Sequence, residues 1–119
     1  MQPDVAKCLL DAAEACRAIE HFVRGFSFVQ NEKNLLLRSG VERQFEILGE
    51  ALRRAEVIDA TLIEKLPDMR LIIGMRNRII HGYDSVDNRI VWDAVQTHIP
   101  PLAAWLDAAA IPLPPDPGP

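Results

Sequence analysis

The segment L-R-S-G-V-E-R-Q-F-E-I-L-G-E-A-L-R-R-A, residues 37–55, decides the fold class of this chain. Its apolar residues recur every three or four positions, which places them on one face of an α-helix. They are Leu37, Val41, Phe45, Leu48, Leu52 and Ala55. Asn31 is a candidate N-cap for this helix, because an asparagine side chain accepts hydrogen bonds from free backbone amides. Gly40 and Gly49 weaken the helix and indicate that a neighbouring element comes close to it.

The same helical spacing continues on both sides of this segment. Upstream, one apolar stripe spans residues 5–26, with Pro3 suited to a first turn and Gly25 near the end. Downstream, Asp59 or Thr61 opens a short helical turn that Pro67 interrupts. These patterns predict a long helix before the central one and a short turn after it.

Two further helices complete the pattern. Apolar residues surround much of the run 68–80, so this helix is expected to lie deeper than its neighbours, and Gly82 is expected to end it in a left-handed conformation. Asp87 is the candidate N-cap of the last helix, which Pro100 and Pro101 should kink.

No stretch alternates apolar and polar residues over a useful length, so no strand is predicted. The predicted fold is all-α, an antiparallel four-helix bundle with a kinked last helix. One domain is expected over residues 1–107, followed by a flexible Pro-rich tail over 108–119.

Composition narrows the classes of function. The net charge is −4 at pH 7, which argues against a generally basic nucleic-acid coat but leaves room for a focused cationic cleft. No apolar run reaches the roughly 18 residues of a membrane span, and no leader peptide opens the chain, so a cytoplasmic location is expected. Cys8 and Cys16 on one helix would lie about 12 Å apart along its axis. That is too far for a disulfide, so both are expected to be buried thiols.

The chemistry of the chain is concentrated in R-N-R-I-I-H-G-Y, residues 76–83. Arginine holds phosphate, and histidine titrates near neutral pH and moves protons. Arg76 and His81 are therefore candidates for metal-free RNA cleavage, supported by Asn77 and Arg78. His81 falls in the last turn, where the helix dipole favours the protonated ring.

Helix geometry separates the two principal candidates. Asn77 and His81 are one turn apart on the same face, whereas Arg76 and His81 differ by roughly 140° around the axis. A two-fold dimer would relieve this, because both copies of the motif would line one site. A pair of histidines, one from each subunit, would then serve as base and acid. From spacing alone, an ordinary solvated helix end is the favoured interpretation, since short motifs match by chance.

Several separated pieces of the chain resemble one family. The ends of the motif, Arg76 and His81, match the R-x4-H signature of the HEPN superfamily (higher eukaryote and prokaryote nucleotide-binding domains), and Tyr83 gives the R-x4-H-x-Y form of its HepT-like branch. The pieces V-E-R-Q-F-E-I-L-G-E-A at 41–51, V-W-D-A-V at 91–95 and I-P-P-L at 99–102 agree with that branch in content and order.

The resemblance implies a specific biology. HepT-like proteins are all-helical homodimers that act as RNase toxins of type VII toxin–antitoxin pairs. Their partner, an MntA-type nucleotidyltransferase, neutralises them by adenylylating the motif tyrosine. Carried over, Arg76 and His81 become catalytic, Asn77 and Arg78 supporting or RNA-binding, and Tyr83 the modified residue. The proposed proton chemistry requires no metal, no carboxylate cluster or Cys/His set indicates one, and no cofactor is expected.

Alternatives remain open at this stage. The chain is also compatible with a non-catalytic nucleotide- or partner-binding subunit of a nucleotidyltransferase, or with a plain helical scaffold. The charged residues of the central helix are interpreted as a solvated face with local ion pairs; they are Glu42, Arg43, Glu46 and Glu50. His21 and His98 are interpreted as structural.

Overall fold

The computed structural model describes residues 1–82, 86–109 and 111–112. These residues form helices α1 (Pro3–Val23), α2 (Phe28–Glu32), α3 (Leu35–Ile58), α4 (Leu62–Lys65), α5 (Met69–His81), α6 (Asn88–Thr97) and α7 (Ile99–Ala108). No strand occurs in this described part of the chain, and the predicted all-α bundle is confirmed. Tyr83 and most of the predicted tail at 108–119 lie outside the described residues.

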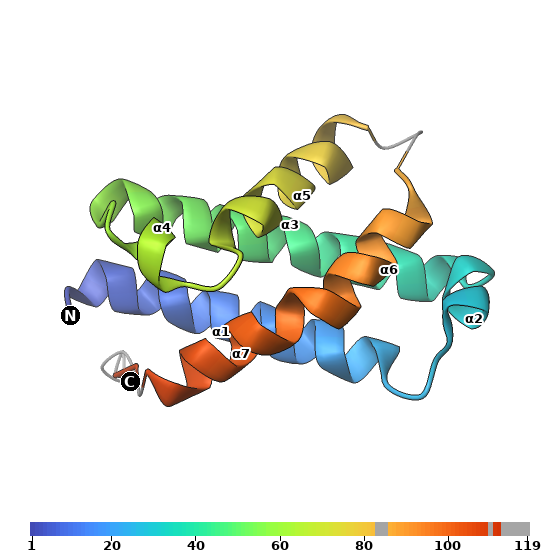
Figure 1. Ribbon diagram of the computed structural model, residues 1–119, viewed down its shortest axis with the longest axis horizontal. Helices are drawn as coiled ribbons and strands as arrows, with labels where there is room; N and C mark the ends of the chain where they lie inside the picture. The colour runs from blue at the N-terminus through green and yellow to red at the C-terminus, as the bar shows by residue number, and fades with distance from the viewer. Residues whose placement is uncertain (83–85, 110, 113–119) are drawn as a thin grey trace, which may run out of the picture.

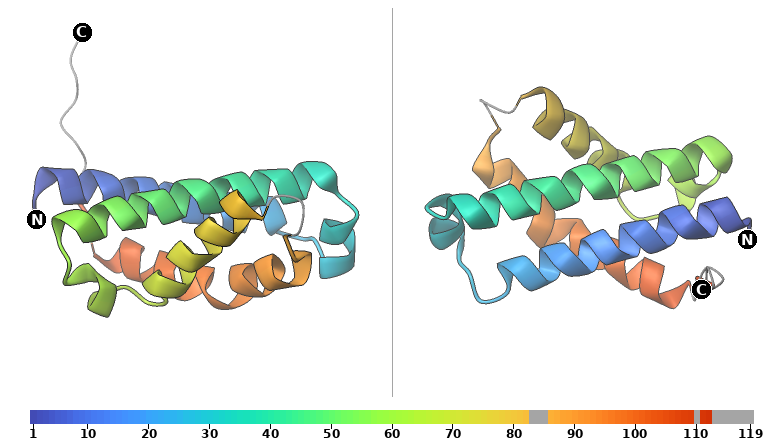
Figure 2. Two further views of the ribbon diagram at one scale, coloured as in Figure 1. Left: turned by 90° about the horizontal axis from the view of Figure 1, so that it is seen from above. Right: turned by 180° about the vertical axis from the view of Figure 1, so that it is seen from behind.

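The helices form two layers (Figures 1 and 2). The long helices α1 and α3 run antiparallel, side by side, and α5 and the α6–α7 pair cross them obliquely on one side. Large apolar side chains from both layers are fully buried between them, among them Leu9, Phe45, Leu48, Ile72 and Leu102. Each such side chain contributes roughly 1.5–3 kcal/mol of transfer free energy, so this interface holds the fold together.

The start of the central helix differs from the prediction. Asn31 does not cap it, because the chain first makes the short helix α2, and Asn31 is buried inside that turn. Ser27 caps α2 through a reciprocal capping box with Gln30. Asn34 caps α3 instead, and its Oδ1 accepts a hydrogen bond of 3.0 Å from the Leu37 amide.

Helix α5 also departs from two expectations. Gly82 has φ −123°, so the predicted left-handed ending is wrong; the left-handed residue is Asp68 at the other end, with φ 57°. The helix is not the deepest one either. Only Met69, Ile72 and Ile79 are buried, and Leu71 is 58% exposed, because α5 packs on α3 and leaves its outer face open to solvent.

The predicted interruption of the last helix is confirmed and takes the form of a break. Asp87 caps α6 as predicted, accepting a hydrogen bond of 2.8 Å from the Arg89 amide. The helix ends at Thr97, and α7 begins at Ile99 with its prolines in the first turn, where a missing amide costs nothing. At this break His98 Nδ1 lies 2.7 Å from Asp68 Oδ2, which ties the break to the start of α5.

Smaller predictions are settled by the same structure. Gly25 follows α1 with φ 81°, as a helix-ending glycine should, although Phe26 lies beyond the helix and is exposed. Both cysteines are free; Cys16 is buried and Cys8 is half-buried. None of the helices in the described residues has the length and apolar character that a membrane crossing requires.

Candidate active site

The site begins with a close approach between α3 and α5. A Cβ atom built on Gly49 would lie 2.3 Å from Cβ of Arg76 and 2.8 Å from its Cγ. No real side chain fits at that distance, so only glycine allows the Arg76 stem to cross α3 here. Gly40 likewise lies against the Phe22 ring, and the close approaches predicted for both glycines are confirmed.

The Arg76 guanidinium is held on several sides. Its Nη2 lies 2.9 Å from Oε2 of Glu50, and its Nη1 donates to Oδ1 of Asn77 over 3.1 Å. Its Nε is buried and has no hydrogen-bond partner among the described residues. The side chain is 22% exposed, so the arginine presents one edge to solvent and keeps the rest against α3.

Glu50 is the centre of a cluster of three arginines. Its Oε1 accepts hydrogen bonds from Arg53 Nη2 at 2.8 Å and from Arg54 Nε at 3.0 Å. Its Oε2 accepts one from Arg53 Nε at 3.2 Å and pairs with Arg76. These arginines, Arg53 first, lower the pKa of the Glu50 carboxyl to about 2, because hydrogen bonds to the charged form stabilise it. Glu50 is therefore ionised at every pH at which the protein would meet RNA.

This cluster opens onto a surface hollow of about 410 Å³ on one flank of α5. Arg76 and Ile80 of α5 line it from one side, and residues of α1 and α3 line it from the other, including Lys7 and Arg54. The hollow therefore carries cationic side chains from three helices at the point where Arg76 emerges.

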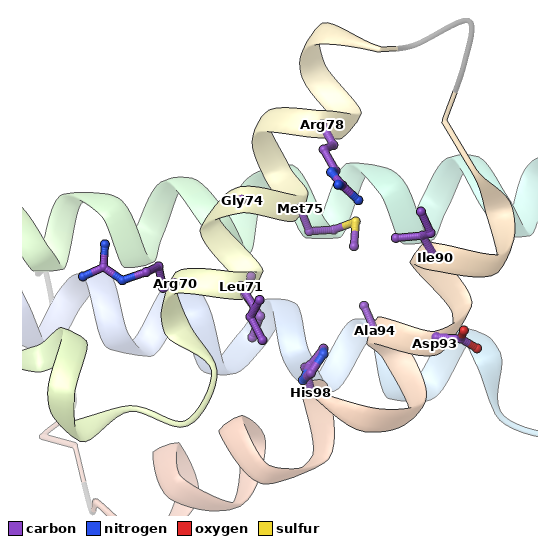
Figure 3. Close-up of a pocket in the computed structure, with 10 residues that line it drawn as sticks. Arg70, Leu71, Gly74, Met75, Arg78, Ile90, Asp93, Ala94 and His98 are labelled. Carbon is purple, nitrogen blue, oxygen red and sulfur yellow. The ribbon is translucent and has the colours of Figure 1, made fainter.

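His81 lies on the opposite flank of α5. It lines a hollow of about 390 Å³ between α5 and α6, together with Met75, Arg78 and Ile90. A second hollow of about 460 Å³ continues along the same groove toward His98. Figure 3 shows this second hollow, with Arg78 and Met75 of α5 turned toward Ile90 of α6.

The structure thus brings the predicted residues together in two groups. Arg76 and Asn77 form a hydrogen bond, and Arg78 and His81 share the α6 flank. No described residue lines both the Arg76 hollow and the His81 hollow, so the two catalytic candidates do not converge within one chain. Tyr83 lies outside the described residues.

The sequence-based interpretation of the charged face on α3 is confirmed in part. Arg43 and Glu46 form a local ion pair of 3.1 Å, as such spacing predicts. The contact between Glu50 and Arg76 was not predicted. Gly49 predicted the close approach of a neighbouring element. Spacing alone could not identify that element as α5 or the contacting side chain as Arg76.

Within the described residues, no three His, Cys, Asp or Glu side chains gather closely enough to hold a metal ion. The polar groups that are present favour anion binding and proton transfer.

Comparison with known proteins gives a consistent result. Residues 12–109 match the family described as "Ribonuclease HepT-like", and that range contains the motif at 76–83. A candidate RNase from Methanocaldococcus jannaschii is 30% identical over 83% of this chain and 90% of its own length. A candidate ribonuclease HepT from Thermococcus cleftensis is 35% identical over 79% of this chain and 84% of its own. No solved structure gives a significant match. The chain belongs to the HepT-like ribonuclease family.

Proposed function

We propose that this protein is a metal-independent endoribonuclease that works as a homodimer and as the toxin of a type VII toxin–antitoxin pair. The proposal rests on the combination of HepT-like family membership with a fixed Arg76 and an exposed His81, both on helix α5. In this proposal Arg76 and His81 are catalytic, and Asn77 and Arg78 support them or bind RNA.

The separation of Arg76 from His81 supports a dimer. One subunit offers the two side chains on opposite flanks of α5, and in this proposal a second copy completes the site. The outer face of α5 is suited to such a contact. Gly74 has open space around its Cα, Leu71 is exposed, and Arg70 of the same face forms no ion pair with the described residues. A second α5 packed against this face would bring the two His81 rings toward a common cleft.

The chemistry then follows from paired histidines. One His81 removes the proton of an RNA 2′-hydroxyl, whose oxygen forms a new bond to the adjacent phosphorus. The bond from phosphorus to the 5′-oxygen breaks, and the second His81 gives that oxygen a proton. Arg76 stabilises the extra negative charge on the phosphoryl oxygens in the transition state. The products are a 2′,3′-cyclic phosphate and a 5′-hydroxyl, with no metal and no cofactor.

Neutralisation is proposed to act at Tyr83. This residue lies two positions after His81 in the sequence, so an AMP group attached there adds bulk and negative charge next to the catalytic helix. An MntA-type nucleotidyltransferase is the proposed modifying partner. RNA phosphate would then be repelled or blocked.

The deciding experiment compares wild type with His81→Ala on bulk cellular RNA and tRNA in EDTA. We expect wild type to leave cyclic phosphate ends and His81→Ala to be slower by about 10²- to 10⁴-fold, the usual contribution of general acid–base catalysis. Mass spectrometry first confirms that Tyr83 is unmodified, and circular dichroism confirms that the variant is folded. Equal cleavage by the two proteins would refute the role of His81.

Two observations favour a second function. The Arg76 guanidinium is already paired inside the subunit, and the chain as a whole is acidic, which suits a protein partner at least as well as RNA. A non-catalytic nucleotide- or partner-binding subunit of a nucleotidyltransferase would be modified at Tyr83 by its partner. It would cleave no RNA at any concentration, so the same assay separates the two functions.

A further inference from the structure

The starting observation is that the contact between Glu50 and Arg76 joins two helices, whereas the other contacts of Glu50 are local. Arg53 and Arg54 lie three and four positions after Glu50, where helical spacing brings them back to it. Arg53 binds both carboxylate oxygens, as the planar guanidinium fork allows. The carboxylate is therefore fixed by its own helix before α5 contributes anything.

That fixed carboxylate then meets Arg76 at a point where the arginine has little freedom. Gly49 leaves room for the Arg76 stem directly against α3, and Glu50 binds Nη2 one residue further on. Asn77 accepts from Nη1. Long arginine side chains lose much rotamer entropy when they are ordered, and these contacts remove that freedom before any ligand arrives.

The cluster of Glu50 and its three arginines has a net positive charge. Three arginines share one carboxylate, which leaves an excess of two positive charges around Glu50. A phosphate approaching Arg76 is thus still attracted, even though Arg76 is paired. Glu50 therefore fixes the Arg76 side chain, while the cluster still attracts an anionic ligand.

We propose that Glu50 is a positioning residue for Arg76, which fixes the guanidinium toward the scissile phosphate of RNA. This inference rests on the proposed function, in which Arg76 stabilises the transition state. Displacing a catalytic group by about 1 Å can cost on the order of 10²-fold in rate. Losing the contact should therefore slow the chemical step and spare substrate binding.

The test is Glu50→Gln, which keeps the shape of the side chain and removes its charge. We expect kcat to fall by about 10- to 100-fold. KM should stay level or fall, because the surface becomes more positive. The charge of Glu50 is constant between pH 5 and 9, so the pH profile of the variant should keep the wild-type shape at a lower height. A change in KM alone, or an unchanged kcat, would overturn the proposal.

Asp107→Asn is the matched control. Asp107 pairs with Arg17 over 3.1 Å and also joins two helices, α7 and α1, away from the motif. This variant also loses an ion pair between two helices, although a more exposed one, and should keep wild-type kcat. A second comparison adds Glu50→Gln to the Arg76→Lys variant. The second substitution should lower kcat little further, since Glu50 acts through the arginine. Full additivity of the two losses would contradict positioning.

A measurement that needs no activity separates this inference from the proposed function. The Arg76 Nε–H group, assigned by its loss in Arg76→Lys, is buried and should exchange slowly with solvent in wild type. In Glu50→Gln its signal should move and its exchange should accelerate. Wild-type protein that does not cleave RNA would refute the proposed function and, with it, a role for Glu50 in cleavage. An unchanged Nε–H signal in Glu50→Gln would refute positioning while leaving the nuclease intact.

Discussion

At the scale of single residues, Glu50 has the most consequential environment in the described chain. It sits at the surface, 27% exposed, yet three guanidinium groups converge on it. Arginine stays charged at every accessible pH, so only Glu50 can change the charge balance of the cluster. Its protonation should therefore be visible in the stability of the whole domain.

The pH dependence of stability follows from the lowered pKa of Glu50. The carboxyl titrates near 4.5 when free and near 2 in the folded protein, so its contribution is fully present above about pH 5 and is lost as pH falls toward 2. We predict that the difference in unfolding free energy between wild type and Glu50→Gln is largest at pH 6–7 and shrinks between pH 4.5 and 2. Urea unfolding followed by circular dichroism at a series of pH values measures it.

Salt provides the control for this prediction. Because the cluster lies at the surface, 1 M NaCl should reduce the difference between the two proteins at pH 7. A difference that stays constant from pH 7 to pH 2.5 would mean that the charge of Glu50 does not contribute to the folded state.

At the scale of secondary structure, replacing glycine by alanine should have opposite effects on stability at two positions. Alanine normally stabilises a helix interior by about 1 kcal/mol relative to glycine. At Gly74 of α5 a new Cβ meets nothing within 4 Å inside the subunit, so Gly74→Ala should stabilise the single subunit by up to that amount. At Gly49 the Cβ would collide with the Arg76 stem, so Gly49→Ala should lose about 1–3 kcal/mol from overpacking.

Urea unfolding of the two variants gives the measurement. Gly49→Ala should also lower RNA cleavage, since α5 must move away from α3 to admit the methyl group. If Gly49→Ala proved as stable as Gly74→Ala, the close approach of the two helices in the structure would be contradicted.

The helices and their caps differ in how well the sequence predicts them. Hydrophobic spacing predicted the long helices and Asp87 predicted a start, because periodicity and capping are local. The wrong predictions concerned features that depend on how the helices pack against one another. Helix α5 was expected to lie deeper than its neighbours because apolar residues surround much of it, but it has one open face. Asn31 resembled a cap but is part of an extra helical turn. At the candidate site, the motif predicts Arg76 and His81 as catalytic residues, whereas the contact between Glu50 and Arg76 depends on which helices pack together.

At the scale of the whole molecule, the proposed function gives one reaction two residues on opposite flanks of α5, Arg76 and His81. The fold leaves the outer face of α5 open, and in the proposed dimer each subunit would contribute one His81. If both His81 rings serve one reaction, as base and as acid, a dimer with a single His81 is inactive. If each subunit works alone, such a dimer keeps half of the activity.

Subunit mixing distinguishes these cases. Wild type and His81→Ala are unfolded together and refolded at a fixed total concentration, so that dimers form at random. For a shared site we predict that activity falls as the square of the wild-type fraction, because only dimers with two intact histidines act. At an equal mixture, about one quarter of the activity would remain under random pairing. Size-exclusion chromatography with light scattering confirms that all mixtures are dimeric.

A linear fall in activity would contradict a site that uses both histidines and would assign one His81 to each cleavage event. The contact of Arg76 with Gly49 and Glu50 opposes a rearrangement of α5, so the single His81 would then be expected to meet Arg76 of the other subunit. Repeating the mixture with Arg76→Ala in place of His81→Ala extends the test. A squared dependence for both variants would mean that the transition state is surrounded by both copies of the motif. A linear dependence for Arg76→Ala alone would assign one arginine to each cleavage event while the histidines remain shared.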